Sequence, residues 1–284
     1  MTNAIISLDA RFKIGVFLFY LVLIPFLISC QKKAESITFD YGTQSDSARY
    51  YYHLGWQQIM DNGQWTLSEE SFRKAIIFDS SFLLGKVLVA RISPDLAERL
   101  TLYKEVKTQI TKASESERLL MEVYLSNVER MNLREQNPSL AKDKSAAHCV
   151  FSEQNFRKFV HQFPEESYVK AEYIEVLHAN YGAKPALDSL QKLMTQNQQN
   201  VPFFVSYPAL LEAELGHFDQ ALAKANRLKE MLADTPLPAP YVVFAEIYDK
   251  MGSTKIAQSY INKAVQLDPK HLIALELKKK MEKE

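Results

Sequence analysis

The sequence lacks most of the residue patterns on which nucleotide-binding and nucleic-acid-binding proteins depend. Only 8 of its 284 residues are glycine, and neither a Gly-x-x-x-x-Gly-Lys-Ser/Thr loop nor a Gly-x-Gly-x-x-Gly loop occurs to hold a phosphate group. The 34 basic and 34 acidic residues balance, so no overall positive charge attracts DNA, RNA or an anionic membrane. We therefore expect no nucleic acid among its partners.

Cysteine is also scarce, and the spacings typical of metal sites are missing. Two cysteines cannot build a four-cysteine zinc site or a disulfide-dense scaffold. The 6 histidines form no His-Glu-x-x-His pattern, and no carboxylates gather at metal-ligand spacing. We therefore expect neither a metal nor a cofactor.

The one candidate nucleophile in the body of the chain is Cys149, which directly follows His148. Adjacent residues on a helix point about 100° apart, so His148 is badly placed to act as the base for this thiol. No glycine-rich oxyanion turn accompanies the pair. We expect a structural thiol, no catalytic residue and no enzyme activity, with an enzyme that uses Cys149 as the less favoured alternative.

Helix-forming residues are what the sequence has in plenty. Leu, Ala, Lys, Glu and Gln are abundant, and this mixture favours helices over a turn-rich β fold. Hydrophobic residues make up 47% and charged residues 24%, close to the average of folded proteins. The composition therefore predicts an all-α fold.

The first thirty residues have the order of parts found in a bacterial signal peptide. Arg11 and Lys13 precede an uncharged apolar run over residues 14–28, which is short for a membrane-spanning helix and contains a proline. Its end, Ser29-Cys30, resembles the lipobox of bacterial lipoproteins, in which the cysteine becomes the lipidated first residue. We predict a lipoprotein signal peptide over 1–29, lipidation of Cys30 and a flexible tether over 30–45. An uncleaved membrane anchor and a buried N-terminal helix are the alternatives.

The C-terminal half repeats a helical pattern. Its last copy has an apolar stripe from Tyr241 to Tyr248, then Gly252, a second stripe from Ala257 to Val265, and the stop Asp268-Pro269. The pattern resembles the tetratricopeptide repeat, which has a period of about 34 residues. Equivalent glycines at 182 and 216 extend it toward the N-terminus. The clearest repeats are predicted over 168–201, 202–237 and 238–271.

Residues 46–165 are predicted to form more degenerate repeats. Tyr52 and Trp56 mark a first helix, and a one-residue insertion around residues 63–65 precedes the second. Ser114 and Glu117 form a capping box before a further apolar stripe. Residues 131–147 are polar, which predicts a loop or a solvated helix start. The resemblance implies an α-solenoid of about six antiparallel helix pairs in a right-handed superhelix, and residues 272–284 are predicted to be a solvating C-terminal helix.

The resemblance also implies a function. Tetratricopeptide repeats line a concave groove with the exposed positions of each first helix, and the groove typically takes a peptide or a partner helix. Together with the lipobox, this predicts a lipid-anchored scaffold for protein–protein interaction in the bacterial cell envelope, in the outer membrane, with the periplasmic or surface face left open. The predicted partner-binding residues are Ser206, Leu210, Glu214, Val242, Glu246, Asp249 and Lys250.

An accessory glycan- or ligand-binding surface lipoprotein is the alternative function. The 14 tyrosines could supply flat surfaces on which sugar rings stack. Surface glycan-binding lipoproteins of Bacteroidota are also built on tetratricopeptide-like helices, but they carry large insertions for which this chain has little room.

Overall fold

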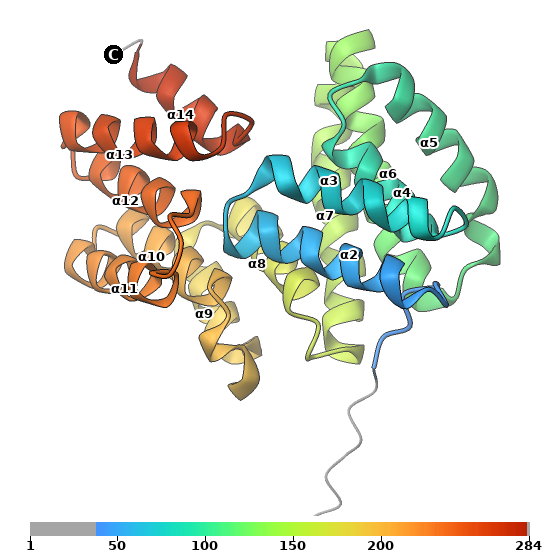
Figure 1. Cartoon of the computed structure of the whole chain (residues 1–284), viewed down its shortest axis with the longest axis horizontal. Helices are drawn as coiled ribbons and strands as arrows, with labels where there is room; N and C mark the ends of the chain where they lie inside the picture. Colours follow the sequence, from blue (N-terminus) through green and yellow to red (C-terminus); the bar gives the residue numbers. More distant parts are fainter. Residues whose placement is uncertain (1–37, 283–284) are drawn as a thin grey trace, which may run out of the picture. The chain divides into compact units, whose positions relative to one another are not determined.

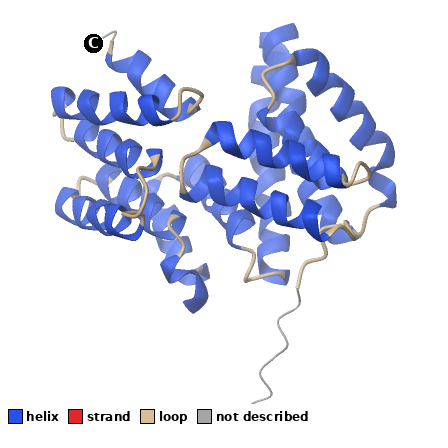
Figure 2. Ribbon diagram, in the orientation of Figure 1, coloured by secondary structure: helices blue, strands red, loops and turns tan. Residues whose placement is uncertain are grey.

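The computed structural model describes residues 38–282, in which it places thirteen α-helices and no strand (Figure 1, Figure 2). The predicted signal peptide and Cys30 lie outside the described residues. Each helix packs mainly on its neighbours in the chain, as stacked hairpins do. The prediction of an all-α solenoid is confirmed.

Twelve of the helices form six consecutive pairs within residues 38–267, and one helix follows them. The pairs are α2 (Asp46–Trp56) with α3 (Trp65–Phe78), α4 (Leu83–Ile92) with α5 (Leu96–Gln109), α6 (Glu115–Gln136) with α7 (Pro138–Gln162), α8 (Ser167–Tyr181) with α9 (Ala183–Leu193), α10 (Phe203–Glu214) with α11 (Phe218–Met231), and α12 (Pro238–Lys250) with α13 (Thr254–Leu267). The last helix is α14 (Leu272–Met281), and the short helical turns η2 (Gln57–Asp61), η3 (Ile110–Lys112) and η4 (Gln196–Asn200) lie between helices.

Small residues at the helix crossings let the backbones approach closely. Ala245 of α12, together with Ala257 and Ala264 of α13, is fully buried, and larger apolar side chains fill the spaces around them. The turn between these two helices contains Gly252 at φ +74°, a left-handed conformation that favours glycine. Each of the three repeats predicted most clearly spans one such helix pair.

The described chain begins with a segment that is buried. Phe39 is 6% exposed, and its ring centroid lies 4.8 Å from that of Phe159 on α7 and 5.2 Å from that of Phe163. The Tyr41 hydroxyl donates a hydrogen bond of 2.5 Å to Glu166. The flexible tether predicted over 30–45 is therefore wrong in its last part, because Phe39 and Tyr41 supply apolar area to the core.

The polar stretch 131–147 is helical apart from Asn137, so of the two alternatives predicted there, a loop or a solvated helix start, the structure has the solvated helix start. α6 runs to Gln136 and α7 starts at Pro138. Asn137 between them accepts a hydrogen bond from the Leu140 amide, and Pro138 takes the first helical position, which suits its fixed φ. The apolar stripe is missing because this end of the helix pair is largely exposed to solvent.

α14 differs in part from the predicted solvating cap. Ala274 and Met281 are buried against the preceding repeat, and Lys280 lies 2.9 Å from Asp249 in an ion pair. Its exposed face nevertheless includes Leu272 and Ile273, at 48% and 46% exposure. This face is therefore only partly polar.

The first helix pair contacts the last one, which the repeat pattern does not predict. The extra residue near 63–65 is accommodated by the π-helical turn η2 and by Gly63 at φ +71°. The loop that follows reaches the C-terminal repeats, where the Ala239 amide donates to the Asn62 carbonyl at 3.1 Å. Thr66 donates to the Asp268 carboxylate through its amide at 3.0 Å and its hydroxyl at 2.6 Å. The stack of repeats thus closes on itself.

Candidate functional site

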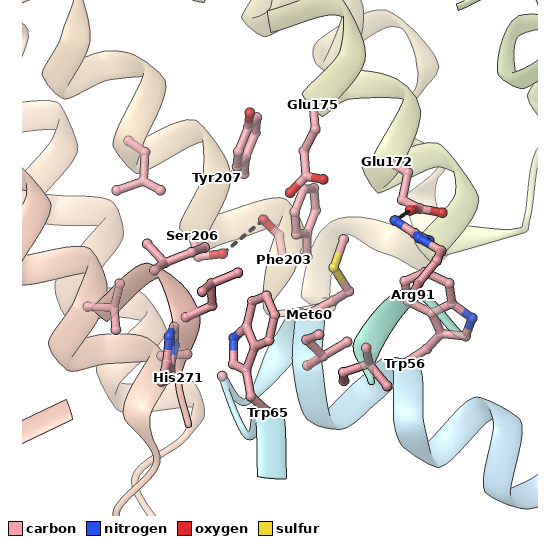
Figure 3. A pocket seen from close by; sticks show the side chains of 18 of the residues that line it. Trp56, Met60, Trp65, Arg91, Glu172, Glu175, Phe203, Ser206, Tyr207 and His271 are labelled. Carbon is pink, nitrogen blue, oxygen red and sulfur yellow. Dashed lines mark hydrogen bonds and ion pairs between the residues drawn. The ribbon is translucent and has the colours of Figure 1, made fainter. Parts of the chain in front are cut away.

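The closure surrounds a cavity of about 470 Å³ on the inner side of the helix stack (Figure 3). The wall is formed by side chains of η2 and of the helices α2, α3, α4, α6, α8, α10 and α12. The start of α14 and the turn before it complete the wall. Its volume lies within the range of roughly 300–1,000 Å³ that is typical of ligand-binding pockets. Because the wall combines the first and last helix pairs, the cavity depends on the contacts that the turn 62–64 and the start of α3 make with the C-terminal repeats.

A buried carboxylate holds the middle of this closure. Asp61, at the end of η2, accepts a hydrogen bond from the Tyr168 hydroxyl at 2.8 Å and another from the Phe203 amide at 3.1 Å. It therefore joins η2 to both α8 and α10. Burial raises the pKa of Asp61 to about 6, because the charged carboxylate has lost most of its hydration.

Aromatic rings form much of the wall. Both tryptophans of the chain, Trp56 of α2 and Trp65 of α3, line the cavity. Phe203 and Tyr207 of α10 stack with a centroid distance of 5.1 Å and an angle of 15° between their planes. His271 lies beside Trp65 at 5.8 Å between centroids, and burial lowers its pKa to about 4, so its ring is neutral near pH 7.

Arg91 and Glu172 compensate each other on one wall. An Arg91 Nη lies 2.7 Å from a Glu172 carboxylate oxygen. The other oxygen accepts a hydrogen bond of 2.6 Å from the Tyr124 hydroxyl. The guanidinium also lies over the Tyr124 ring, 4.5 Å from its centroid, and 5.9 Å from the centroid of Trp56. These interactions link α4, α6 and α8. Because the two charges are paired, they leave little net electrostatic potential in this part of the wall.

Two further carboxylates in the wall are compensated only at longer range, Glu175 by Arg91 and Glu246 by Lys250. Glu175 of α8 and Glu246 of α12 have no hydrogen bond or ion pair within residues 38–282. In Figure 3 the Glu175 carboxylate points toward the ring of Phe203. Loss of hydration to the surrounding protein disfavours the charged form of both groups and raises the pKa of each to about 7. Part of each side chain still reaches solvent, because Glu175 is exposed and Glu246 is half-buried.

Four of the seven predicted partner-binding residues line the cavity: Ser206, Leu210, Val242 and Glu246. The other three do not. Glu214 lies 3.3 Å from His178 and 3.9 Å from Lys250, and Asp249 pairs with Lys280. Whether any of the seven binds a partner stays a prediction.

Sequence reasoning missed the part of the wall supplied by the N-terminal half. One missed residue had a signal, because Glu172 lies 34 positions before Ser206 and so occupies the same repeat position. No sequence signal pointed to the other missed residues, Trp65, Arg91 and Glu175. They reach the cavity only because the helix stack closes, or they fall outside the repeat register.

Cys149 lies away from this cavity and is half-buried on α7. The two ring nitrogens of His148 interact with other groups, at 2.9 Å from the Ser126 hydroxyl and 3.4 Å from the Ser152 hydroxyl. The geometry therefore does not present His148 as a base for the thiol. Among residues 38–282 there is also no cluster of three or more His, Cys, Asp or Glu side chains suited to a metal ion. No helix in this part of the chain has the length and apolar character needed to cross a membrane.

Comparison with known families supports the repeat assignment for the last helix pair. The family model of the tetratricopeptide repeat matches residues 239–271, which cover α12, α13 and the turn before α14. No curated protein matches the chain. Tetratricopeptide repeats generally bind protein partners, so the match suggests a scaffold for protein–protein interaction.

Proposed function

We propose that this protein is a lipid-anchored scaffold of the bacterial cell envelope that binds a segment of a protein partner in the cavity. The observation that carries the proposal is the position of Ser206, Leu210, Val242 and Glu246, which the repeat register assigned to a groove and which line one cavity. A wall of aromatic rings and a few polar groups is typical of a site that orients a bound segment.

The anchor rests on the lipobox-like end of the signal sequence at Cys30. Several acyl chains, each methylene contributing about 0.8 kcal/mol, would hold the protein at the membrane permanently. Because Phe39 is already buried, the chain between it and Cys30 can span at most about 30 Å at full extension. This length keeps the helical domain, and any partner it binds, close to the membrane surface.

The test is crosslinking in cells, followed by detergent extraction and mass spectrometry of the proteins that co-purify with the tagged full chain. The variant Leu210→Arg places a charge in the cavity wall, and Ile77→Arg is the matched control on the 77% exposed Ile77, which does not line the cavity. A third strain carries Cys30→Ala.

We expect a recurrent partner that is retained by Ile77→Arg, lost from Leu210→Arg, and reduced when the anchor is removed. Circular dichroism melting is the check that both arginine variants are folded. A partner that survives Leu210→Arg would place binding elsewhere, and the absence of any recurrent partner would contradict the scaffold.

Glycan binding is the second candidate, because both tryptophans and the Phe203–Tyr207 ring pair present flat surfaces in one cavity. Oligosaccharides that stack there would change the intrinsic tryptophan fluorescence of the purified chain. A saturable change with a neutral oligosaccharide, combined with no protein partner in cells, would favour this candidate over the scaffold.

A further inference from the structure

The charge of the cavity wall is unevenly distributed. Arg91 and Glu172 cancel each other, and His271 is neutral, which leaves Arg134 of α6 against Glu175 of α8 and Glu246 of α12. Above about pH 7, where Glu175 and Glu246 are ionised, the wall therefore has an excess of one negative charge. The negative groups come from the side of the cavity formed by the C-terminal repeats.

Both carboxylates line the same cavity as Tyr207 of α10, Glu175 from α8 and Glu246 from α12. Burial raises the pKa of the Tyr207 hydroxyl above its usual range, and the negative charges of Glu175 and Glu246 add to this rise. The hydroxyl itself lies 2.9 Å from Nδ1 of His178. Glu214 acts on the same hydroxyl but is already compensated by His178 at 3.3 Å. A cation in the cavity would therefore meet two carboxylates that make no hydrogen bond or ion pair within residues 38–282 and feel Arg91 and Lys250 only at longer range.

The aromatic wall suits the same kind of occupant. Phe203 and Tyr207 present stacked rings in the same cavity wall as these carboxylates, and the electron-rich faces of aromatic rings attract ammonium and guanidinium groups. Leu210, Val242 and Ile273 supply apolar surface around them. An occupant that complements this wall has a positive group flanked by apolar groups.

The cavity has the size of a site for a few side chains. Its volume of about 470 Å³ accommodates one long side chain together with the apolar groups beside it, as an extended segment would present them.

We propose that the cavity receives a lysine or arginine side chain from an extended segment of the protein partner, with Glu175 and Glu246 as its counter-ions, the Phe203–Tyr207 pair as its aromatic wall, and apolar neighbours against Leu210 and Val242. This inference rests on the proposed function and adds the chemistry of the segment that is recognised. The positive charge of Arg134 on α6 repels the same cation, which therefore lies nearer to α8 and α12.

The experiment uses the full chain in detergent and three capped peptides, Ala-Leu-X-Leu-Ala, in which X is lysine, norleucine or glutamate. Binding is followed by intrinsic tryptophan fluorescence, because Trp56 and Trp65 are the chain's 2 tryptophans and both line the cavity. We expect the lysine peptide to bind about tenfold more tightly than the norleucine peptide, the size of effect given by one partly desolvated cation contact. The glutamate peptide is expected to bind most weakly.

Matched variants separate the two carboxylates from general charge effects. The double variant Glu175→Gln, Glu246→Gln keeps the side-chain shapes and is expected to abolish most of the lysine preference. Glu230→Gln on the exposed face of α11 removes the same kind of charge outside the cavity and should leave the preference unchanged. Arg134→Gln should strengthen binding of the lysine peptide, because it removes the one opposing charge.

Equal dissociation constants for the lysine and norleucine peptides, or no fluorescence change with any of the three up to millimolar concentration, would overturn the inference. The proposed function fails separately. If crosslinking in cells recovers a partner that Leu210→Arg loses while the peptides show no preference for lysine, only the chemistry assigned to the segment is wrong.

Discussion

Gly63→Ala tests the closure of the helix stack most directly. Gly63 has φ +71°, and a Cβ atom there would lie 2.9 Å from the Ala239 amide nitrogen and 3.1 Å from a ring nitrogen of His271. Both neighbours belong to the C-terminal repeats. The atom at 2.9 Å belongs to the backbone and cannot move aside as a flexible side chain does. A methyl group on residue 63 therefore forces the turn 62–64 away from α12.

Gly252→Ala is the matched control. Gly252 has nearly the same conformation, φ +74°, but a Cβ atom there would meet nothing within 4 Å. Both variants carry the cost of about 1–2 kcal/mol for a non-glycine residue in the left-handed region. Gly63→Ala should cost about 1–2 kcal/mol more, because moving the loop breaks the hydrogen bond from Ala239 to Asn62 and disturbs the neighbouring contacts.

The assay is urea unfolding of both variants and the parent chain, with tryptophan fluorescence as a second readout of the folded state. Trp65 lies two residues beyond Gly63 and lines the cavity, so its native emission should shift in Gly63→Ala and stay unchanged in Gly252→Ala. Equal unfolding free energies for the two variants, with unchanged emission in both, would refute the role assigned to the closure.

Three further outcomes follow from the same contacts. Burial raises the pKa of Asp61 to about 6, so the folded chain keeps a proton that the unfolded chain releases at lower pH. At pH 7 the ionised carboxylate lowers the unfolding free energy by about 3 kcal/mol. Asp61→Asn should therefore gain stability relative to the parent as the pH rises from 4 to 7 in urea titrations, and a constant difference would contradict this sign. Phe39→Ala should lower the unfolding free energy by about 3 kcal/mol in the same assay, whereas a free tether residue would change nothing. Ser114→Ala removes the capping box of α6 and should lower the thermal midpoint, at a cost of about 1 kcal/mol; no shift would show that Glu117 alone caps the helix.

Much of the helical framework could be predicted from sequence because its signals are local. Ser114 and Glu117 form the predicted capping box, with the Glu117 amide 3.2 Å from the Ser114 hydroxyl. Asp268-Pro269 ends α13, and Gly252 has the left-handed conformation expected after α12. Each of these signals depends on residues a few positions apart, so the sequence alone contains it.

The polar ends of α6 and α7 show where local patterns fail. A helix is recognised by an apolar stripe, and the stripe disappears where a helix pair extends past its neighbours into solvent. The cap at Asn137 and Pro138 was the signal that remained. Phe39 and Tyr41 show the opposite case, in which a polar stretch hides two aromatic residues that become buried.

The sequence by itself determined the all-helical class, the tetratricopeptide repeat over the last helix pair, the capping box at Ser114 and four positions of the cavity wall. Repeat spacing made the last of these possible, because it assigns equivalent residues to one face. Only the tertiary structure decided that the stack closes, since Thr66 and Asp268 are 202 residues apart and no local pattern links them. That closure brings Trp56, Trp65 and Arg91 to the same cavity as Glu175 and Glu246. The site depends on how the small rotation between successive repeats accumulates over six helix pairs, and this is a property of the whole stack.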